Sequence, residues 1–180
     1  MEIAFYILLF LFVAAEVFTI IRYVKKKESK CVKFTAVPAG FFLAYLLALC
    51  IFRISIPYLV LTLAAITVFL HTVMGLYLDM YHRVKYFDRC LHAFGSFSFA
   101  LLIYLTLSSI TAPGGSMLFR AVFIAALGIA AGAVFEIIEF LNDQKNKTKM
   151  QRGLKDTDFD IIFDVVGSVA AAILAALVYL

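Results

Sequence analysis

Residues 117–141 read MLFRAVFIAALGIAAGAVFEIIEFL, an almost unbroken apolar run that closes on two glutamates. About 20 apolar residues in a helix cross the roughly 30 Å hydrocarbon core of a bilayer. The run is continuous, which favours a helix over the alternating pattern of a barrel strand. Gly128 and Gly132 form a G-xxx-G pair, and Gly167 with Ala171 is a small-xxx-small pair further along the chain. Such pairs let membrane helices approach closely, so we expect the last two apolar runs to pack together.

Five other apolar stretches accompany this one. The six predicted spans cover about residues 3–24, 34–53, 56–78, 90–110, 117–141 and 159–180. The 180 residues are 64% hydrophobic and 16% charged, whereas a soluble domain is about 45–50% apolar and about 25% charged. We therefore predict an all-α, polytopic membrane bundle of six transmembrane helices, forming a single transmembrane domain over residues 1–180.

Basic residues gather in alternate loops between the spans. Of the 16 Lys and Arg residues, 14 lie in or beside the first, third and fifth loops, and only Arg53 and Arg120 lie elsewhere. The positive-inside rule places such basic loops in the cytoplasm. We therefore expect both termini outside, in a multi-pass protein of the cell membrane. Basic loops at the membrane surface attract anionic lipid headgroups, so we expect membrane lipids as partners. The net charge of +4 is carried by these loops, and we expect no nucleic-acid partner.

Acidic residues gather at one end of the last three spans. Eight of the 12 acidic residues lie there, and His92 joins them: Asp88, Glu136, Glu139, Asp143, Asp156, Asp158, Asp160 and Asp164. Within each span most keep a helical spacing of three or four residues, which places them on one face. An ionisable group costs roughly 2.5–3.5 kcal/mol at the centre of a membrane helix and less near its ends. Three such stripes at one membrane level can converge on a single cytoplasm-facing site.

Carboxylates beside an imidazole suit a divalent cation, because unpaired carboxylates repel one another. Oxygen ligands favour Mg²⁺ or Mn²⁺, and an added imidazole admits Mn²⁺, Fe²⁺ or Zn²⁺. We predict a site for a divalent cation such as Mg²⁺, Mn²⁺ or Zn²⁺. It could bind or act on a polar lipid, a lipid-linked phosphate substrate or a cell-envelope precursor. Its metal ligands would be Asp88, Glu136, Asp160 and Asp164, and in an enzyme His92 or Glu139 would act as the catalytic base.

Two other interpretations stay open at this point. Carboxylates that hand on protons would serve a small ion- or proton-coupled transporter. Glu16 and His71, each about 12 Å inside the boundary, would then form a secondary polar layer, or they could simply pair with each other. Alternatively, the acidic residues only hold the bundle together through salt bridges, in a non-catalytic envelope protein. The sequence leaves open the choice between enzyme, transporter and structural protein, and it does not set the oligomeric state.

Familiar catalytic signatures are absent from the sequence. It has no phosphate-binding glycine-rich loop followed by Lys and Ser or Thr, no HExxH and no nucleophile elbow. The three cysteines, Cys31, Cys50 and Cys90, are scattered and form no CxxC pair. The prediction of a metal site therefore rests on the spacing of the acidic residues.

Four short segments of the second half resemble a group of small bacterial membrane proteins. They are YFDRCLHAFG at 86–95, FEIIEF at 135–140, RGLKDT at 152–157 and DIIFDVVG at 160–167. Their order is similar to that in VanZ-like proteins and in the YjdF-type inner-membrane family, over residues 86–172. VanZ-like proteins are linked with low-level glycopeptide resistance, so the resemblance implies an antibiotic-resistance-associated protein of the bacterial inner membrane. VanZ-like proteins often carry Gln and Asn where this chain has Glu139 and Asp164, a difference that favours a metal or proton role.

Overall fold

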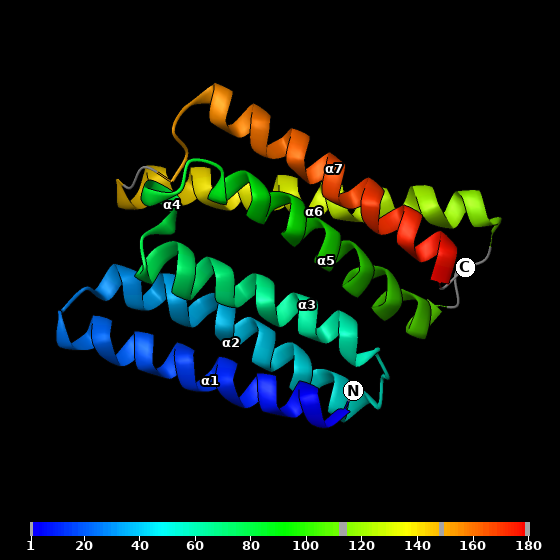
Figure 1. Ribbon diagram of the computed structural model, residues 1–180, viewed down its shortest axis with the longest axis horizontal. Helices are drawn as coiled ribbons and strands as arrows, with labels where there is room; N and C mark the ends of the chain where they lie inside the picture. The colour runs from blue at the N-terminus through cyan, green and yellow to red at the C-terminus, as the bar shows by residue number, and fades with distance from the viewer. Residues whose placement is uncertain (1, 112–114, 148–149, 179–180) are drawn as a thin grey trace. The chain divides into compact units, whose positions relative to one another are not determined.

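The computed structural model describes residues 2–111, 115–147 and 150–178, and all regular structure in these ranges is helical. The elements are α1 (Glu2–Lys25), α2 (Ser29–Phe52), α3 (Tyr58–Phe69), the π-helix η1 (Leu70–Tyr77), α4 (Met80–Arg83), α5 (Phe87–Thr111), α6 (Met117–Asn146) and α7 (Leu154–Val178). Six helices are long and apolar enough to cross a membrane, with α3 and η1 forming one continuous span (Figure 1). The predicted all-helical fold with six spans is confirmed, and the orientation of the spans stays a prediction.

Three helices extend beyond the predicted apolar runs at their acidic ends. Helix α5 begins at Phe87, α6 continues to Asn146, and α7 already begins at Leu154. Polar residues continue the same backbone hydrogen-bond ladder, and the charges of these end turns suit the helix dipole. Asp156 lies in the first turn of α7 and Lys145 in the last turn of α6. The acidic residues are therefore on helices, and their spacing keeps them on one face.

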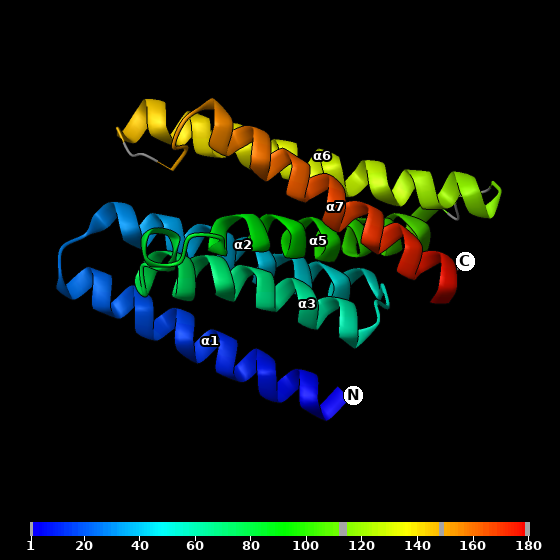
Figure 2. The same ribbon diagram turned by 45° about the horizontal axis from the view of Figure 1, so that its top comes forward.

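The chain divides into two compact units, residues 1–87 and 88–180. In the first unit, α1, α2 and α3 lie side by side, as the two ribbon views show (Figures 1 and 2). Phe12 of α1 packs edge to face on Phe42 of α2, with ring centroids 5.6 Å apart. In the second unit, α5, α6 and α7 pack together. The prediction of a single transmembrane domain stays a prediction.

Helix α3 widens into the π-helix η1 where the sequence indicated one uninterrupted span. A side chain at Gly75 would overlap the ring of Tyr81, so glycine makes room for the tyrosine here. The Tyr81 hydroxyl oxygen lies 2.6 Å from His71 Nδ1, and Thr72 is buried beside His71 in the same element. π-turns are rare and often mark functional sites. The widened turn therefore places two polar side chains inside the first unit.

Small residues set the packing of the second unit. A Cβ at Gly128 would overlap the Ser168 side chain, and a Cβ at Gly132 would overlap that of Asp164. Helix α6 therefore packs directly on α7, and the predicted close contact of these two helices is confirmed. Gly167 faces a different neighbour, because a Cβ there would overlap the Ala93 carbonyl group of α5. All three helices meet at glycines, which brings their acidic ends together.

Candidate metal centre

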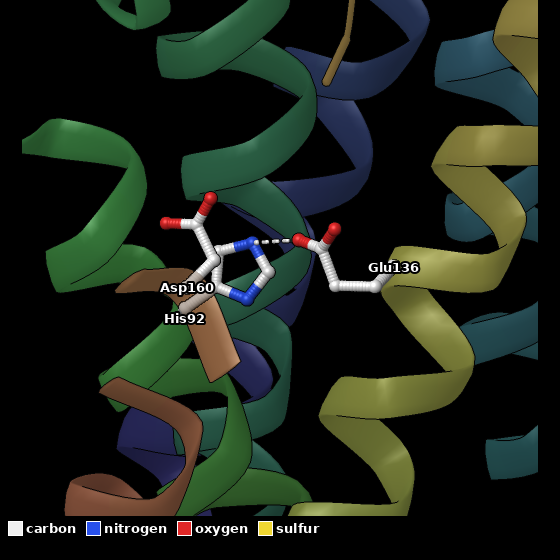
Figure 3. A group of neighbouring side chains, drawn as sticks. All are labelled: His92, Glu136 and Asp160. Carbon is white, nitrogen blue, oxygen red and sulfur yellow. Dashed lines mark ion pairs between the residues drawn. The ribbon is translucent and has the colours of Figure 1, made fainter. Parts of the chain in front are cut away.

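Three ligand-type side chains from three helices converge in the second unit. His92 comes from α5, Glu136 from α6 and Asp160 from α7, and one ligand atom of each lies within 4.8 Å of the others. All three residues are buried, with exposed fractions of 6%, 4% and 3%. His92 Nε2 lies 3.5 Å from Glu136 Oε1, an ion-pair distance marked by the dashed line in Figure 3. The predicted convergence of the three acidic stripes therefore includes these residues.

Each of the three side chains has a buried polar atom without a hydrogen-bond partner among the described residues. These atoms are His92 Nε2, Glu136 Oε1 and Asp160 Oδ1. A buried polar atom left unsatisfied costs about 1–3 kcal/mol, so folded proteins contain few of them. Here the three unpartnered atoms belong to the three residues whose ligand atoms cluster. Their arrangement indicates a position for a group that could interact with all three.

Asp164 fixes the orientation of the His92 ring. His92 Nδ1 lies 3.2 Å from Asp164 Oδ1 and 3.3 Å from Oδ2. A carboxylate only accepts hydrogen bonds, so Nδ1 carries a hydrogen; in the neutral ring Nε2 is then the nitrogen with the lone pair. Ser96 Oγ donates to Asp164 Oδ1 at 2.5 Å, and Gly132 leaves the space that this carboxylate fills. The imidazole is thus held with its ligand nitrogen toward Glu136.

The loop between α6 and α7 orients Glu136 from the other side. Gln151 Nε2 donates to Glu136 Oε2 at 2.7 Å and to the Glu136 carbonyl oxygen at 3.0 Å. The backbone N–H groups of Met150 and Gln151 donate to the Asp143 carboxylate, at 2.9 and 3.0 Å. Asp143 therefore anchors the loop, and Gln151 holds one carboxylate oxygen of Glu136. The other oxygen, Oε1, is the unpartnered one.

A second acidic group adjoins the first. Asp88, Asp156 and Asp160 also offer oxygen atoms within 4.8 Å of one another. Arg152 Nη2 donates to Asp88 Oδ2 at 2.5 Å, and Arg152 Nε donates to Asp156 Oδ2 at 3.1 Å. Partial burial alone would lower the pKa of Arg152, but the carboxylates of Asp156 and Asp88 raise it above its usual value. The arginine therefore stays charged and neutralises part of this group.

Comparison with known proteins places the chain in a family of membrane proteins. Residues 4–179 match the family described as "Predicted membrane protein (DUF2238)". The chain belongs to this family. An uncharacterised protein of Thermotoga maritima is 34% identical to this DUF2238 chain over 102 residues, which cover 56% of the chain and 53% of the relative. The chain thus spans about half the length of that curated relative.

No solved structure matches the DUF2238 chain. Neither the VanZ-like nor the YjdF-type name follows from the family match, which establishes a membrane protein without a stated activity. The membrane location is therefore shown, whereas the bacterial inner membrane stays an expectation from the resemblance.

The structure of this DUF2238 chain brings most of the predicted site residues together. Asp88, His92, Glu136, Asp160 and Asp164 are linked by the contacts described above. Glu139, the other predicted base, is buried one turn beyond Glu136. Asp88 Oδ1 also lies 3.9 Å from His92 Nε2. The predicted chemical roles of these residues stay predictions, because geometry alone does not test them.

Glu16 and His71, the predicted secondary polar layer, lie in the first unit. Thr72 Oγ1 donates to Glu16 Oε1 at 2.5 Å, and His71 contacts Tyr81 as described. Both residues are buried. Each therefore has a partner of its own within η1 or beside it, and their role in a polar layer stays a prediction.

Three residues of the site were not singled out from the sequence. Ser96 follows His92 by four residues, so the helical spacing that linked Asp88 with His92 could have found it. Gln151 and Arg152 lie in a loop, and a loop has no helical periodicity from which the direction of a side chain could be predicted. Their contacts depend on the path of the loop, which Gly153 turns with a φ of 112°.

Proposed function

We propose that this DUF2238 chain is a cation-dependent membrane protein that binds a divalent metal ion through His92, Glu136 and Asp160. The supporting observation is that these residues, from three helices, place ligand atoms within 4.8 Å of one another, and that each also has a buried polar atom without a hydrogen-bond partner among the described residues. A proton would satisfy one contact between two of these side chains, whereas a metal ion would bind one ligand atom from each of the three. One imidazole nitrogen with carboxylate oxygens suits Mn²⁺, Fe²⁺ or Zn²⁺ better than Mg²⁺.

The surrounding contacts support the same proposal. A histidine that binds a metal usually donates its other N–H to a carboxylate, and carboxylate ligands are themselves hydrogen-bonded. Asp164 plays that part for His92, and Gln151 does so for Glu136. The assignment differs from the sequence-based one in three roles: His92 is a ligand instead of a base, Asp164 is its positioning residue instead of a ligand, and Asp88 is not among the ligands of this ion.

The substrate class that we propose is a polar lipid with a phosphate group, or a lipid-linked precursor of the cell envelope. The centre lies near the ends of membrane spans, the level at which lipid headgroups lie. The adjoining end of α6, the start of α7 and the described residues between them carry four basic residues: Lys145, Lys147, Arg152 and Lys155. A bound metal would polarise a phosphate oxygen and activate water. Glu139, buried one turn beyond Glu136, is the residue that could accept a proton there.

Metal content tests the binding step of this proposal. The full chain would be purified in mild detergent without chelator, dialysed against Mn²⁺ or Zn²⁺, and analysed by elemental mass spectrometry. We expect near-stoichiometric metal in the wild type and its loss in Glu136→Gln and in the double variant Asp160→Asn/Asp164→Asn. Asp158→Asn is the matched control, because it removes an exposed carboxylate of the same segment. Equal metal content in wild type and Glu136→Gln would contradict the proposal.

Phosphate release tests the substrate class separately. The metal-loaded protein would be incubated with phosphorylated lipids in mixed micelles, and inorganic phosphate and lipid binding would be measured. We expect binding or turnover that disappears in Glu136→Gln and remains in Asp158→Asn. If the metal binds but no phosphorylated lipid does, the substrate class is wrong while the metal centre stands. Circular dichroism of each variant shows whether the charge change has only damaged folding, as a purely structural role of the carboxylates would require.

A further inference from the structure

The second acidic group, Asp88, Asp156 and Asp160, has oxygen atoms that the proposed metal ion at His92, Glu136 and Asp160 would leave uncoordinated at Asp88 and Asp156. Asp88 and Asp160 are buried and Asp156 is half-buried, and their oxygen atoms cluster within 4.8 Å. Three carboxylates at this separation repel one another strongly in a poorly solvated place. Asp160 belongs to both groups, so the two clusters share a residue. Its Oδ1 atom, on a residue that is only 3% exposed, has no hydrogen-bond partner within the described ranges.

Asp88 also lies between the two groups. Its Oδ1 atom is 3.9 Å from His92 Nε2 in the first group, and its Oδ2 atom accepts the 2.5 Å bond from Arg152 in the second. A carboxylate that turns one oxygen toward each cluster, beside a second carboxylate common to both, is the arrangement that two neighbouring cations need. In two-metal sites the ions lie about 3.5–4 Å apart and clamp the oxygens of a transferring phosphate.

Arg152 is the cation that now interacts with the second group. Its guanidinium group reaches Asp88 and Asp156, and its backbone N–H donates to Asp156 Oδ2 at 3.2 Å. The side chain is 40% exposed, whereas that of Asp88 is 9% exposed. It comes from a loop that turns at Gly153, beside which a Cβ would meet open space. Arg152 thus reaches the carboxylates from a loop and remains partly accessible to solvent.

We propose that Asp88, Asp156 and Asp160 form a second divalent-cation site, joined to the first through Asp160, and that Arg152 occupies it until a second metal ion displaces the guanidinium group. This inference rests on the proposed function of the first site. The second site has only oxygen ligands, which favours Mg²⁺, Mn²⁺ or Ca²⁺ over Zn²⁺. The pair would hold a phosphate ester, and the released Arg152 would lie at the entrance, where it could bind a phosphate oxygen.

Binding of Mn²⁺ to the purified full chain in detergent tests the second site. The measurement is equilibrium dialysis with elemental analysis, which gives both the number of ions and their affinities. We expect one tight and one weaker ion in the wild type. Arg152→Met should tighten the weaker ion by about tenfold or more, because no internal cation then competes for Asp88 and Asp156. Lys155→Met is the matched control, since it removes an exposed positive charge of the same segment without touching the carboxylates.

Two further variants separate the two sites. Asp156→Asn should abolish the weaker ion and keep the tight one, whereas Glu136→Gln should abolish the tight ion and keep the weaker one. The inference is overturned if Arg152→Met binds as the wild type does, if it tightens binding no more than Lys155→Met, or if Asp156→Asn leaves both ions in place. Failure of the proposed function gives a different result. In that case no bound ion is lost in Glu136→Gln, regardless of the result for Asp156→Asn. Arg152→Gln, which also removes the positive charge but keeps a polar side chain, replaces Arg152→Met if the methionine variant does not fold, and it should tighten the weaker ion in the same way.

Discussion

At the scale of single residues, the orientation of His92 decides what the centre can bind. The ring is held by Asp164, and Asp164 in turn accepts the hydrogen bond from Ser96. Helical spacing predicted that Asp88, His92, Glu136, Asp160 and Asp164 would share one region. Spacing could not show that Asp160 is the proposed ligand and Asp164 the supporting residue, because both lie on the same face of one helix. The difference lies in which atoms are already hydrogen-bonded.

Ser96→Ala tests this support. Without the Ser96 hydroxyl, Asp164 loses a 2.5 Å hydrogen bond and holds the imidazole less firmly. Loss of such a supporting contact typically weakens metal binding by about 10–100-fold, and we expect a decrease in that range for Mn²⁺ or Zn²⁺. Ser98→Ala is the control, because Ser98 is equally buried but donates to the Phe94 carbonyl oxygen of its own helix. Unchanged metal affinity in Ser96→Ala would contradict the supporting role of Ser96.

At the scale of elements, the close approach of α5, α6 and α7 makes the centre possible. The sequence predicted the contact between α6 and α7 from Gly128 and Gly132. It did not predict that Gly167 would face α5. A small residue indicates that another helix packs closely at that position, but it does not indicate which helix. The π-helix η1 was also missed, since Leu70–Tyr77 has the same apolar character as the α-helix before it. The widened turn lies where the Tyr81 ring packs against Gly75, a contact that the apolar pattern does not specify.

Gly167→Ala tests the packing of α5 on α7. The added methyl group would overlap the Ala93 carbonyl group, and backbone cannot move aside as a flexible side chain can. Overpacking of this kind costs about 1–3 kcal/mol and occasionally more, so we expect a clear fall in the denaturation midpoint followed by circular dichroism. Gly40→Ala is the control, because this exposed glycine of α2 has no neighbouring atom within 4 Å of an added Cβ. Equal midpoints for the two variants would mean that α5 and α7 are not closely packed at Gly167.

At the scale of the whole molecule, the six spans follow from composition and length, whereas the orientation follows from charge alone. The apolar runs could be predicted because each is long enough to cross the hydrocarbon core by itself. The extra helical turns at the acidic ends carry no hydrophobic signal, and only the helical spacing of their acidic residues indicated them. The division at residue 87 into two compact units depends on contacts between helices, which a run of apolar residues does not specify.

Labelling of introduced cysteines tests the orientation. Lys26→Cys would place a thiol in the first basic loop, and Arg53→Cys would place one in the second loop, each in a chain without its native cysteines. If the basic loops are cytoplasmic, a membrane-impermeant maleimide added to intact cells should label the second variant and spare the first. Inverted vesicles should give the opposite pattern. The same pattern for both variants, or the reverse assignment, would contradict the predicted topology.

The three helices that supply His92, Glu136 and Asp160 also impose an order on biogenesis. Synthesis delivers α5 first, α6 next and α7 last, so Asp160 and its neighbour Asp164 reach the membrane after the other ligand residues. A nascent chain that has inserted only α5 and α6 has two of the three proposed ligands and an imidazole without its supporting carboxylate. Loading of the proposed metal ion would therefore follow the insertion of α7, and an ion held by these three residues would show that the second unit has finished assembling.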